Sequence, residues 1–167
     1  MKILGEGHFL RLYDEGGWEW VQRNNCSGVA VIVPLTDDSK LIFVEQYRLP
    51  VRSQLIEFPA GLVGDVDAGE AMLTAATREL EEETGYVSDD MRHVCRGPVT
   101  AGLTDELLDF YLAKGLRKVS EGGGDESEDI LVHEVDLASV DSWLKEQQEL
   151  GKMIDLKVYT GLYLLKQ

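Results

Sequence analysis

The sequence predicts a mixed α/β fold, and three observations support this prediction. Residues 28–35 and 41–46 form two nearly continuous apolar runs of strand length, which is typical of buried strands. Residues 70–84 place small and apolar side chains at helical spacing and are followed by Gly85, a residue favoured just after a helix. Residues 137–149 and 155–165 have the pattern of two further amphipathic helices.

The predicted strands follow one another along the chain. Residues 9–13 and 18–23 flank a turn of acidic residues and glycines, which predicts a hairpin. The runs 28–35 and 41–46 are separated by a polar turn, and we expect a second hairpin in the middle of a sheet. Residues 61–69 are predicted to be an acidic, glycine-rich loop. Shorter strands are expected at 55–58, 93–96, 107–113 and 130–135.

Length and composition indicate an ordinary globular chain. The 167 residues suit one domain, 1–167, and 44% hydrophobic with 28% charged residues is a typical composition. We expect no membrane partner and a cytoplasmic location, because there is no long apolar stretch and charged residues interrupt the N-terminus. Cys26 and Cys95 form no metal-binding pair. The net charge of −15 argues against nucleic acid as a partner.

Residues 64–86, GDVDAGEAMLTAATRELEEETGY, carry a dense pattern of acidic residues. Glu79 and Glu83 are four residues apart on the predicted helix, so their side chains share a face. Carboxylates at this spacing suit Mg²⁺, which takes oxygen ligands. Arg78 and Glu82 have the same spacing and predict an ion pair that would hold the helix against the preceding loop. An exposed charged helix without a metal is the alternative for such a stretch.

The wider spacing of this segment is more specific. It matches G-x5-E-x7-R-E-U-x-E-E-x-G-U, where U is a bulky apolar residue, and chance would produce this match about once in a hundred thousand trials. The segment therefore resembles the Nudix box, with Tyr86 at a position that is more often aliphatic. The resemblance implies a Nudix-type α/β/α sandwich with a mixed β-sheet. The matching fixed positions are Gly64, Glu70, Arg78, Glu79, Glu82, Glu83 and Gly85.

The resemblance also implies roles for the matching residues. Glu79 and Glu83 would bind Mg²⁺, for which Mn²⁺ could substitute, and the backbone carbonyl of Ala60 would complete the metal shell. Glu82 would assist in catalysis or bind metal, and Arg78 would pair with a box glutamate.

The lead-in Glu57–Gly61, EFPAG, is similar to that of ADP-ribose pyrophosphatases, in which the box starts at the glycine of this motif. Here Gly61 stands nine residues before Glu70, so the loop is three residues longer and Gly64 supplies the box spacing. The resemblance places Glu70 at the start of the helix, where a carboxylate favours the helix dipole.

A second acidic segment, residues 125–129, resembles the D-E-x-E-D-I loop of bacterial ADP-ribose pyrophosphatases. By that resemblance Glu126 would be the general base that the attacking water requires, and Glu128 would be an additional metal ligand. A solvated loop without chemistry is the alternative for this composition.

Residues 45–48, EQYR, together with the EFPAG motif, resemble the ADP-ribose and nucleotide-sugar branch of the family. This likeness places Arg48 near the pyrophosphate, where its planar guanidinium could bond two phosphate oxygens, and places Glu57 at the site. The alternative for Arg48 is a surface ion pair.

Three further substrate residues are implied by the same resemblance. One of Trp18 and Trp20, of which Trp20 is chosen, would stack on a base, although packing in the core or in a dimer interface explains it nearly as well. Gly102 and Glu106 match the segment that follows the box, but Ala101 replaces the proline of strict ADP-ribose pyrophosphatases. Another nucleoside diphosphate sugar is therefore an open alternative.

The implied function is Mg²⁺-dependent hydrolysis of a nucleoside diphosphate sugar, with ADP-ribose favoured, to a nucleoside monophosphate and a sugar phosphate. In relatives the N-terminal segment crosses to a second subunit, so we expect a homodimer with residues 1–26 at its interface. One alternative is a Nudix hydrolase of nucleoside triphosphates, dinucleoside polyphosphates or capped RNA. Another is a nucleotide-sugar-binding regulator without catalytic activity.

Overall fold

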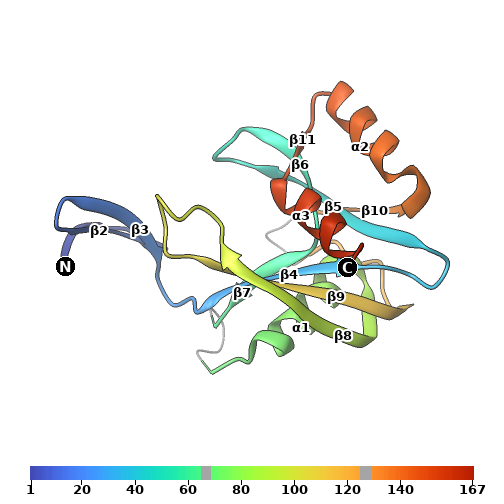
Figure 1. Ribbon diagram of the computed structural model, residues 1–167, viewed down its shortest axis with the longest axis horizontal. Helices are drawn as coiled ribbons and strands as arrows, with labels where there is room; N and C mark the ends of the chain where they lie inside the picture. Colours follow the sequence, from blue (N-terminus) through green and yellow to red (C-terminus); the bar gives the residue numbers. More distant parts are fainter. Residues whose placement is uncertain (65–68, 125–128) are drawn as a thin grey trace.

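The computed structural model describes residues 1–64, 69–124 and 129–167. An N-terminal antiparallel sheet projects from the rest of the molecule (Figure 1) and has the order β1-β2-β3. Its strands are β1 (Lys2–Glu6), which the sequence did not predict, β2 (Leu10–Glu15) and β3 (Trp18–Arg23). The expected β2–β3 hairpin is present, and both glycines of its turn have positive φ angles.

Two four-stranded sheets form the body of the molecule. The first has the order β7-β4-β9-β8, in which β4 and β9 are parallel and the other pairs antiparallel. The second has the order β10-β5-β6-β11, in which β6 and β11 are parallel. The strands are β4 (Gly28–Pro34), β5 (Lys40–Arg48), β6 (Ser53–Glu57), β7 (Ala60–Val63), β8 (Tyr86–Pro98), β9 (Leu107–Lys118), β10 (Leu131–Asp136) and β11 (Met153–Ile154).

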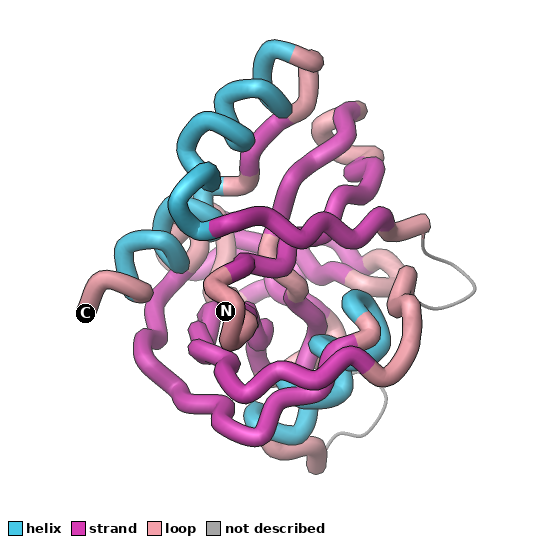
Figure 2. Tube along the Cα trace, turned by 90° about the vertical axis from the view of Figure 1, so that its right-hand side faces the viewer, coloured by secondary structure: helices cyan, strands magenta, loops and turns pink. Residues whose placement is uncertain are grey.

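The helices cover opposite sides of the strands. Figures 1 and 2 show α1 on one side and α2 with α3 on the other. In the described part of the chain the α-helices are α1 (Met72–Thr84), α2 (Val140–Glu149) and α3 (Leu156–Leu164), and a 3-10 turn at Leu137–Ser139 precedes α2. The mixed α/β prediction is confirmed. No helix of the described residues combines the length and apolar character needed to cross a membrane.

Strand β4 divides the core because successive side chains point to opposite faces of the sheet. Ala30 and Ile32 pack with Leu80 of α1, whereas Val31 and Val33 pack with Val158 of α3. All of these side chains are buried, and burying a Val, Leu or Ile side chain stabilises the fold by roughly 1.5–3 kcal/mol. These two cores fix both α1 and α3 on the sheet that carries β7.

The predicted hairpin of residues 28–35 and 41–46 is wrong. Strands β4 and β5 share a single isolated bridge, between Leu35 and Leu41, and then enter different sheets. Each strand is flanked on both sides by other strands, β4 by β7 and β9 and β5 by β10 and β6. Continuous burial reflects these central positions, and it does not reveal which strands are neighbours.

Several boundaries also differ from the prediction, and β8 and β9 are longer than the strands expected at 93–96 and 107–113. Residues 61–63, expected in a loop, belong to β7, because β7 pairs along β4 from Ala60↔Val31 to Val63↔Gly28. Helix α1 begins at Met72, two residues after the predicted start at Glu70.

Candidate functional site

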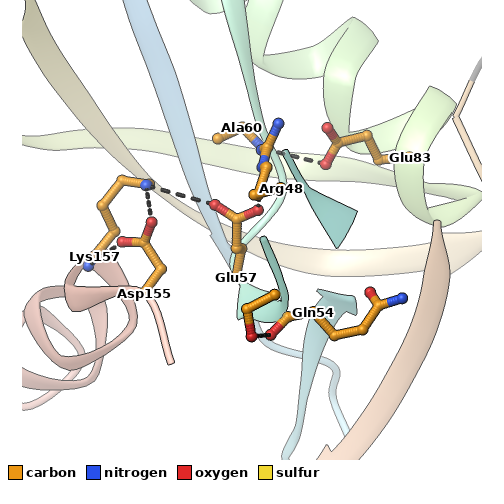
Figure 3. Close-up of polar contacts among 8 residues, drawn as sticks. Arg48, Gln54, Glu57, Ala60, Glu83, Asp155 and Lys157 are labelled. Atoms are coloured by element: carbon orange, nitrogen blue, oxygen red, sulfur yellow. Dashed lines mark hydrogen bonds and ion pairs between the residues drawn. The ribbon is translucent and has the colours of Figure 1, made fainter. Parts of the chain in front are cut away.

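A short crossing segment, Glu57–Gly61, joins the two four-stranded sheets. Its first residue ends β6 in one sheet, and its fourth begins β7 in the other. The segment is fixed within the core: Phe58 is fully buried and stacks on Phe43 with ring centroids 4.9 Å apart, and the Pro59 carbonyl accepts a hydrogen bond from the Ile32 amide at 2.9 Å. Residues on the two sheets are thereby held in a fixed relation (Figure 3).

The β7 end of this segment meets the acidic face of α1. Glu83 is nearly fully buried, and its Oε2 accepts a hydrogen bond from the Ala60 amide at 3.2 Å. One turn earlier, the Glu79 carboxylate lies against the backbone of Gly61, where a Cβ atom would overlap it. Glu79 and Glu83 therefore both face β7, as their spacing on one helix face requires.

Arg78 organises the remaining box carboxylates. Its Nε atom donates to Glu70 Oε1 at 3.1 Å, and its Nη1 atom lies 2.8 Å from Glu79 Oε1 and 3.0 Å from Glu82 Oε2. Its Nη2 atom contacts the Leu62 carbonyl at 3.4 Å, which ties α1 to β7. The hydrogen bonds with Glu70, together with the nearby carboxylates, raise the pKa of Arg78 above its already high ordinary value. The guanidinium is thus a permanently charged clamp.

The predicted place of Glu70 needs correction. The first turn of α1 contains no acidic residue, and Glu70 lies before the N-cap residue Ala71. Both oxygens of its carboxylate accept hydrogen bonds from Arg78, and the carboxylate does not cap the helix. A charged partner within hydrogen-bond distance is a stronger attraction than the partial charge of a helix terminus.

The β6 end of the crossing segment carries an ion pair between Arg48 and Glu57. The Arg48 Nε atom donates to Glu57 Oε2 at 2.7 Å. Register places Val44 opposite Glu57, and Arg48 stands four residues after Val44, so both charged side chains lie on one face of the sheet. Glu57 is only 3% exposed, whereas the Arg48 side chain is 41% exposed. The Arg48 guanidinium is therefore anchored through Nε, while much of the side chain is open to solvent.

A second group of predicted residues lies between β3 and residues 99–106, the loop that joins β8 to β9. The Val21 amide donates to the Leu103 carbonyl at 2.9 Å, and Arg23 Nε bonds Glu106 Oε1 at 2.5 Å. The loop is therefore attached to the N-terminal sheet, and Glu106 already has a cationic partner there.

Trp20 belongs to this second group and is half-buried. Its ring stacks on Tyr13 of the neighbouring strand, with centroids 5.5 Å apart and planes inclined by 22°. Gly102 is exposed, and a Cβ atom there would meet nothing within 4 Å. The described contacts thus bring Arg48, Glu57 and the box together through the crossing segment, and they gather Trp20 and Glu106 around the N-terminal sheet.

The sequence of residues 27–155 matches the family described as NUDIX domain. The chain belongs to the Nudix family. Its Nudix box is the segment that contains α1 and the carboxylates around Arg78.

Two individual proteins are similar to this chain over about two thirds of its length or more. A methanol dehydrogenase activator of Bacillus methanolicus is 35% identical over 122 residues, which cover 72% of this chain and 64% of the relative. An ADP-ribose pyrophosphatase of Bacillus subtilis (strain 168) is 35% identical over 111 residues, covering 66% of this chain and 58% of the relative. The chain thus matches less than two thirds of the length of either relative.

A solved structure described as "Crystal structure of ADP compounds hydrolase" superposes with a TM-score of 0.78. The superposition covers 99% of this chain and 89% of that chain at 22% sequence identity. The two proteins therefore share the Nudix fold, and the expected sandwich with a mixed sheet is confirmed.

The Nudix box of this chain fits a hard divalent cation. The carboxylates of Glu79 and Glu83 and the carbonyl of Ala60 would supply only oxygen donors, which hard divalent cations prefer. The Glu79 carboxylate lies where a Cβ atom of residue 61 would be, so the absence of a side chain at Gly61 lets it reach the backbone of β7 beside Ala60. The described residues contain no cluster of three or more His, Cys, Asp or Glu side chains that could hold a metal ion, so Glu79 and Glu83 would supply only part of the ligand set.

The predicted base and additional ligand, Glu126 and Glu128, lie outside the described residues. The glycines just before them are described and close the end of the box helix. The amides of Gly123 and Gly124 donate to the carbonyls of Glu83 and Glu82 at 2.9 and 3.0 Å. These bonds satisfy helix-end carbonyls that otherwise have no partner.

The close fit at the end of α1 requires glycine. Gly122 has a φ angle of 68°, and a Cβ atom there would overlap the backbone of Thr84. An open cavity of about 620 Å³ lies beside this junction and is lined in part by Arg78, Glu82 and Gly124. By composition the glycine run is expected in an acidic loop, and its packing against the end of α1 has no periodic signal in the sequence.

Sequence reasoning also missed Lys157 and Asp155, which it assigned only to an amphipathic helix. The Lys157 ammonium lies 3.7 Å from Glu57 Oε1 and forms a second ion pair with the Asp155 carboxylate (Figure 3). Asp155 caps α3 by accepting the Lys157 amide at 2.7 Å. The cap can be predicted from the sequence, because an Asp stands just before a helical pattern. The contact of Lys157 with Glu57 joins residues a hundred positions apart and has no such local signal.

Proposed function

We propose that this Nudix protein hydrolyses the pyrophosphate bond of a nucleoside diphosphate sugar, with ADP-ribose favoured, to a nucleoside monophosphate and a sugar phosphate. The observation that carries the proposal is the crossing segment Glu57–Gly61. It fixes the Arg48–Glu57 pair on one sheet relative to Glu79 and Glu83 beside the other. The name of the Bacillus subtilis relative supports this substrate class, whereas the name of the Bacillus methanolicus relative specifies no cleaved bond.

The proposed reaction is a displacement at phosphorus. A water oxygen forms a bond to one phosphorus, the bridging P–O bond breaks, and a proton of the water passes to a carboxylate base. Arg48 would hold a phosphate oxygen through the part of its guanidinium that Glu57 does not use, because charge-assisted hydrogen bonds to phosphate are short and strong. Gly102 would lie near the substrate, as its match to relatives implies.

The metal in this proposal is Mg²⁺, with Mn²⁺ able to substitute. When bound, it would neutralise charge on the phosphates and help to generate and orient the nucleophile. Glu79, Glu83 and the Ala60 carbonyl would hold it, with Glu128 as a further ligand. Arg78 would keep Glu79 and Glu82 in place. Activity should disappear with a chelator and return on addition of Mg²⁺.

The proposed general base is Glu126, on the strength of the resemblance of its acidic segment to that of bacterial ADP-ribose pyrophosphatases. Glu126→Gln should lower kcat by about 100-fold or more, since general acid–base catalysis contributes 10²–10⁴-fold. Glu121→Gln, a change in a nearby exposed carboxylate, is the matched control. Near-normal turnover by both Glu126→Gln and Glu128→Gln would show that the base lies elsewhere.

We also propose that residues 1–167 form one domain and that two copies form a homodimer through the N-terminal sheet. Several large apolar side chains of this sheet are exposed, among them Ile3, Phe9 and Trp18. Exposed apolar patches of this kind mark interaction surfaces. A dimer would place Trp20 and Glu106 of one subunit near the site of the other. Light scattering should give twice the chain mass, and a monomer at micromolar concentration would contradict this part of the proposal.

The cellular location in this proposal is the cytoplasm, where nucleotide sugars are available to a soluble enzyme. Fractionation of the native source would test it, and recovery of the protein from a secreted or membrane fraction would contradict it.

The substrate class is tested with a panel of compounds in Mg²⁺, followed by chromatographic identification of the products. The panel contains ADP-ribose, ADP-glucose, GDP-mannose, UDP-glucose, a diadenosine polyphosphate and dGTP. We expect a nucleoside monophosphate and a sugar phosphate from at least one sugar nucleotide, fastest from ADP-ribose. Turnover of dGTP or the diadenosine compound alone would overturn the substrate class. Tight binding without any turnover would instead indicate a regulator.

A further inference from the structure

Helix α3 and its N-cap residue contact both residues that flank Glu57, Ile56 and Phe58. The Asp155 amide donates to the Ile56 carbonyl at 3.0 Å. Four residues after Lys157, Gly161 packs so closely on Phe58 that a Cβ atom would lie 2.5 Å from its ring. Lys157 stands between these two contacts, so the position of its backbone relative to Glu57 is fixed by the packing of α3.

The two oxygens of Glu57 have different cationic partners. Arg48 Nε donates to Oε2 at 2.7 Å, and Lys157 Nζ lies 3.7 Å from Oε1. A carboxylate as buried as Glu57 is stable in its charged form only when it is paired. Lys157 thus supplies charge on one side of Glu57, which leaves the other side for Arg48.

Asp155 in turn holds Lys157. Burial of Asp155 favours its neutral form, but the hydrogen bonds and charge of Lys157 outweigh burial and keep the pKa of Asp155 below its ordinary value. The Asp155 carboxylate bonds both the amide and the ammonium of Lys157. The ammonium is therefore held at Glu57 and does not extend into solvent.

We propose that Lys157 is a positioning residue for substrate binding, which acts through Glu57 on Arg48. The chain Asp155–Lys157–Glu57–Arg48, drawn in Figure 3, links the C-terminal helix to the guanidinium that binds a phosphate of the substrate. This inference rests on the proposed function, because it takes Arg48 to be the phosphate-binding residue. It adds a residue from a further element, α3, to a site otherwise built from β5, β6, β7 and α1.

The inference makes a kinetic prediction that a purely structural salt bridge does not. Without Lys157, no ammonium group lies beside Glu57 Oε1, and the Glu57 carboxylate is held less firmly. The carboxylate is then a less fixed anchor for Arg48 in the substrate-free protein. Arg48 must then be ordered when substrate binds, which weakens binding and leaves the reacting atoms unaffected. If the salt bridge served only to attach α3, its loss would lower the thermal midpoint of unfolding and leave KM unchanged.

The test is a double-mutant cycle on Lys157 and Arg48. Lys157→Met should raise KM for ADP-ribose about fivefold, with kcat within about twofold of wild type, because the charge-assisted hydrogen bond from Arg48 to the substrate is weakened and not removed. Lys157→Arg should restore KM, because it keeps the charge. In an Arg48→Met background, Lys157→Met should have no further effect on KM. Lys145→Met, at a lysine whose side chain is 77% exposed on α2, is the matched control.

Other outcomes of the cycle would overturn the inference. It fails if Lys157→Met changes only the thermal midpoint, or if it raises KM equally in the wild-type and Arg48→Met backgrounds. If circular dichroism shows that the Lys157→Met variant does not fold, the Lys157→Gln variant takes its place in the cycle.

A parallel measurement separates this inference from the proposed function. The dissociation constant of the α,β-methylene analogue of ADP-ribose is measured by calorimetry with Mg²⁺ for every variant. Binding of the analogue without hydrolysis of any sugar nucleotide would refute the proposed function, and the same cycle on the dissociation constants would still decide the role of Lys157. A wild-type protein that neither binds the analogue nor hydrolyses ADP-ribose would refute both.

Discussion

Two buried glutamates on neighbouring strands each have two basic partners, but on opposite faces of their sheet. Glu57 on β6 lies opposite Val44, and Glu45 is the next residue of β5, so their side chains point to opposite sides. Glu45 is 8% exposed and accepts hydrogen bonds from His133 at 2.8 Å and from Lys152 at 2.7 Å. The two carboxylates therefore have the same kind of surroundings in different places.

The partners of Glu45 join elements to one another. His133 comes from β10, and Lys152, which follows α2, also bonds Gln147 of that helix at 2.9 Å. Both basic side chains are mostly buried. Around Glu57, by contrast, Arg48 is substantially exposed, and the chain runs on directly to Ala60 and Gly61 beside the Nudix box. A buried carboxylate with two basic partners is therefore structural when both partners are mostly buried, and it becomes part of a site when one of them is open to a ligand.

The largest expected effect is a loss of activity on substitution of Gly61, which lies beside the Nudix box. Gly61→Ala would put a methyl group where the Glu79 carboxylate lies, so the carboxylate must move. Displacement by about 1 Å can lower catalysis about 100-fold, and we expect a loss of that order in kcat/KM for ADP-ribose. Gly97→Ala is the control, because a Cβ atom at Gly97 would meet nothing within 4 Å. Full activity of Gly61→Ala would mean that Glu79 has no precise role.

A smaller effect is expected on the structural side. Glu45→Gln removes the charge that pairs Lys152 and His133 and should lower the free energy of unfolding by about 2 kcal/mol, less than for a fully enclosed pair because both partners are partly exposed. Urea unfolding measures this change. Glu149→Gln, at a glutamate whose side chain is 70% exposed, should leave the free energy unchanged within about 0.5 kcal/mol. Equal effects of the two substitutions would contradict the contrast.

The smallest expected effect is a pH dependence at Glu45. Burial favours the neutral carboxyl, but hydrogen bonds from Lys152 and His133 outweigh it and hold the pKa of Glu45 below its ordinary value of 4.5. A lowered pKa stabilises the fold above about pH 4.5, and this stabilisation is lost as the pH falls through the pKa of the folded state.

The difference in free energy of unfolding between wild type and Glu45→Gln should therefore be constant near neutral pH and narrow below about pH 4.5. Urea titrations at several pH values measure it. A difference that widens on acidification would show that the ionised form of Glu45 is not the stabilising one.

The parts of the molecule that the sequence predicts are those whose signal is local. The helical spacing of residues 72–84, the shared face of Glu79 and Glu83, and the pairing of Arg78 with Glu82 all follow from positions within a few residues of one another. The β2–β3 hairpin follows in the same way from the glycines of its turn. Local spacing therefore predicts one half of the candidate site.

The other half depends on pairings between distant segments. The apolar runs that form β4 and β5 are alike in composition, and only their partners decide that they enter different sheets. The short strand β11 exists because β6 offers it a free edge, and it places Lys157 near Glu57. Interactions between residues a hundred positions apart leave no periodic trace in a single sequence, so this contribution of α3 could not be predicted.

The central claim, that the Glu57 side of the sheet is the substrate site and the Glu45 side is structural, is tested most directly by comparing Glu57→Gln with Glu45→Gln. Steady-state hydrolysis of ADP-ribose in Mg²⁺ is measured for both. The structure predicts that Glu57→Gln lowers kcat/KM by about 10-fold to 100-fold, the range for a charge-assisted hydrogen bond, while Glu45→Gln stays within about twofold of wild type. Equal losses in the two variants, or a larger loss for Glu45→Gln, would contradict this account.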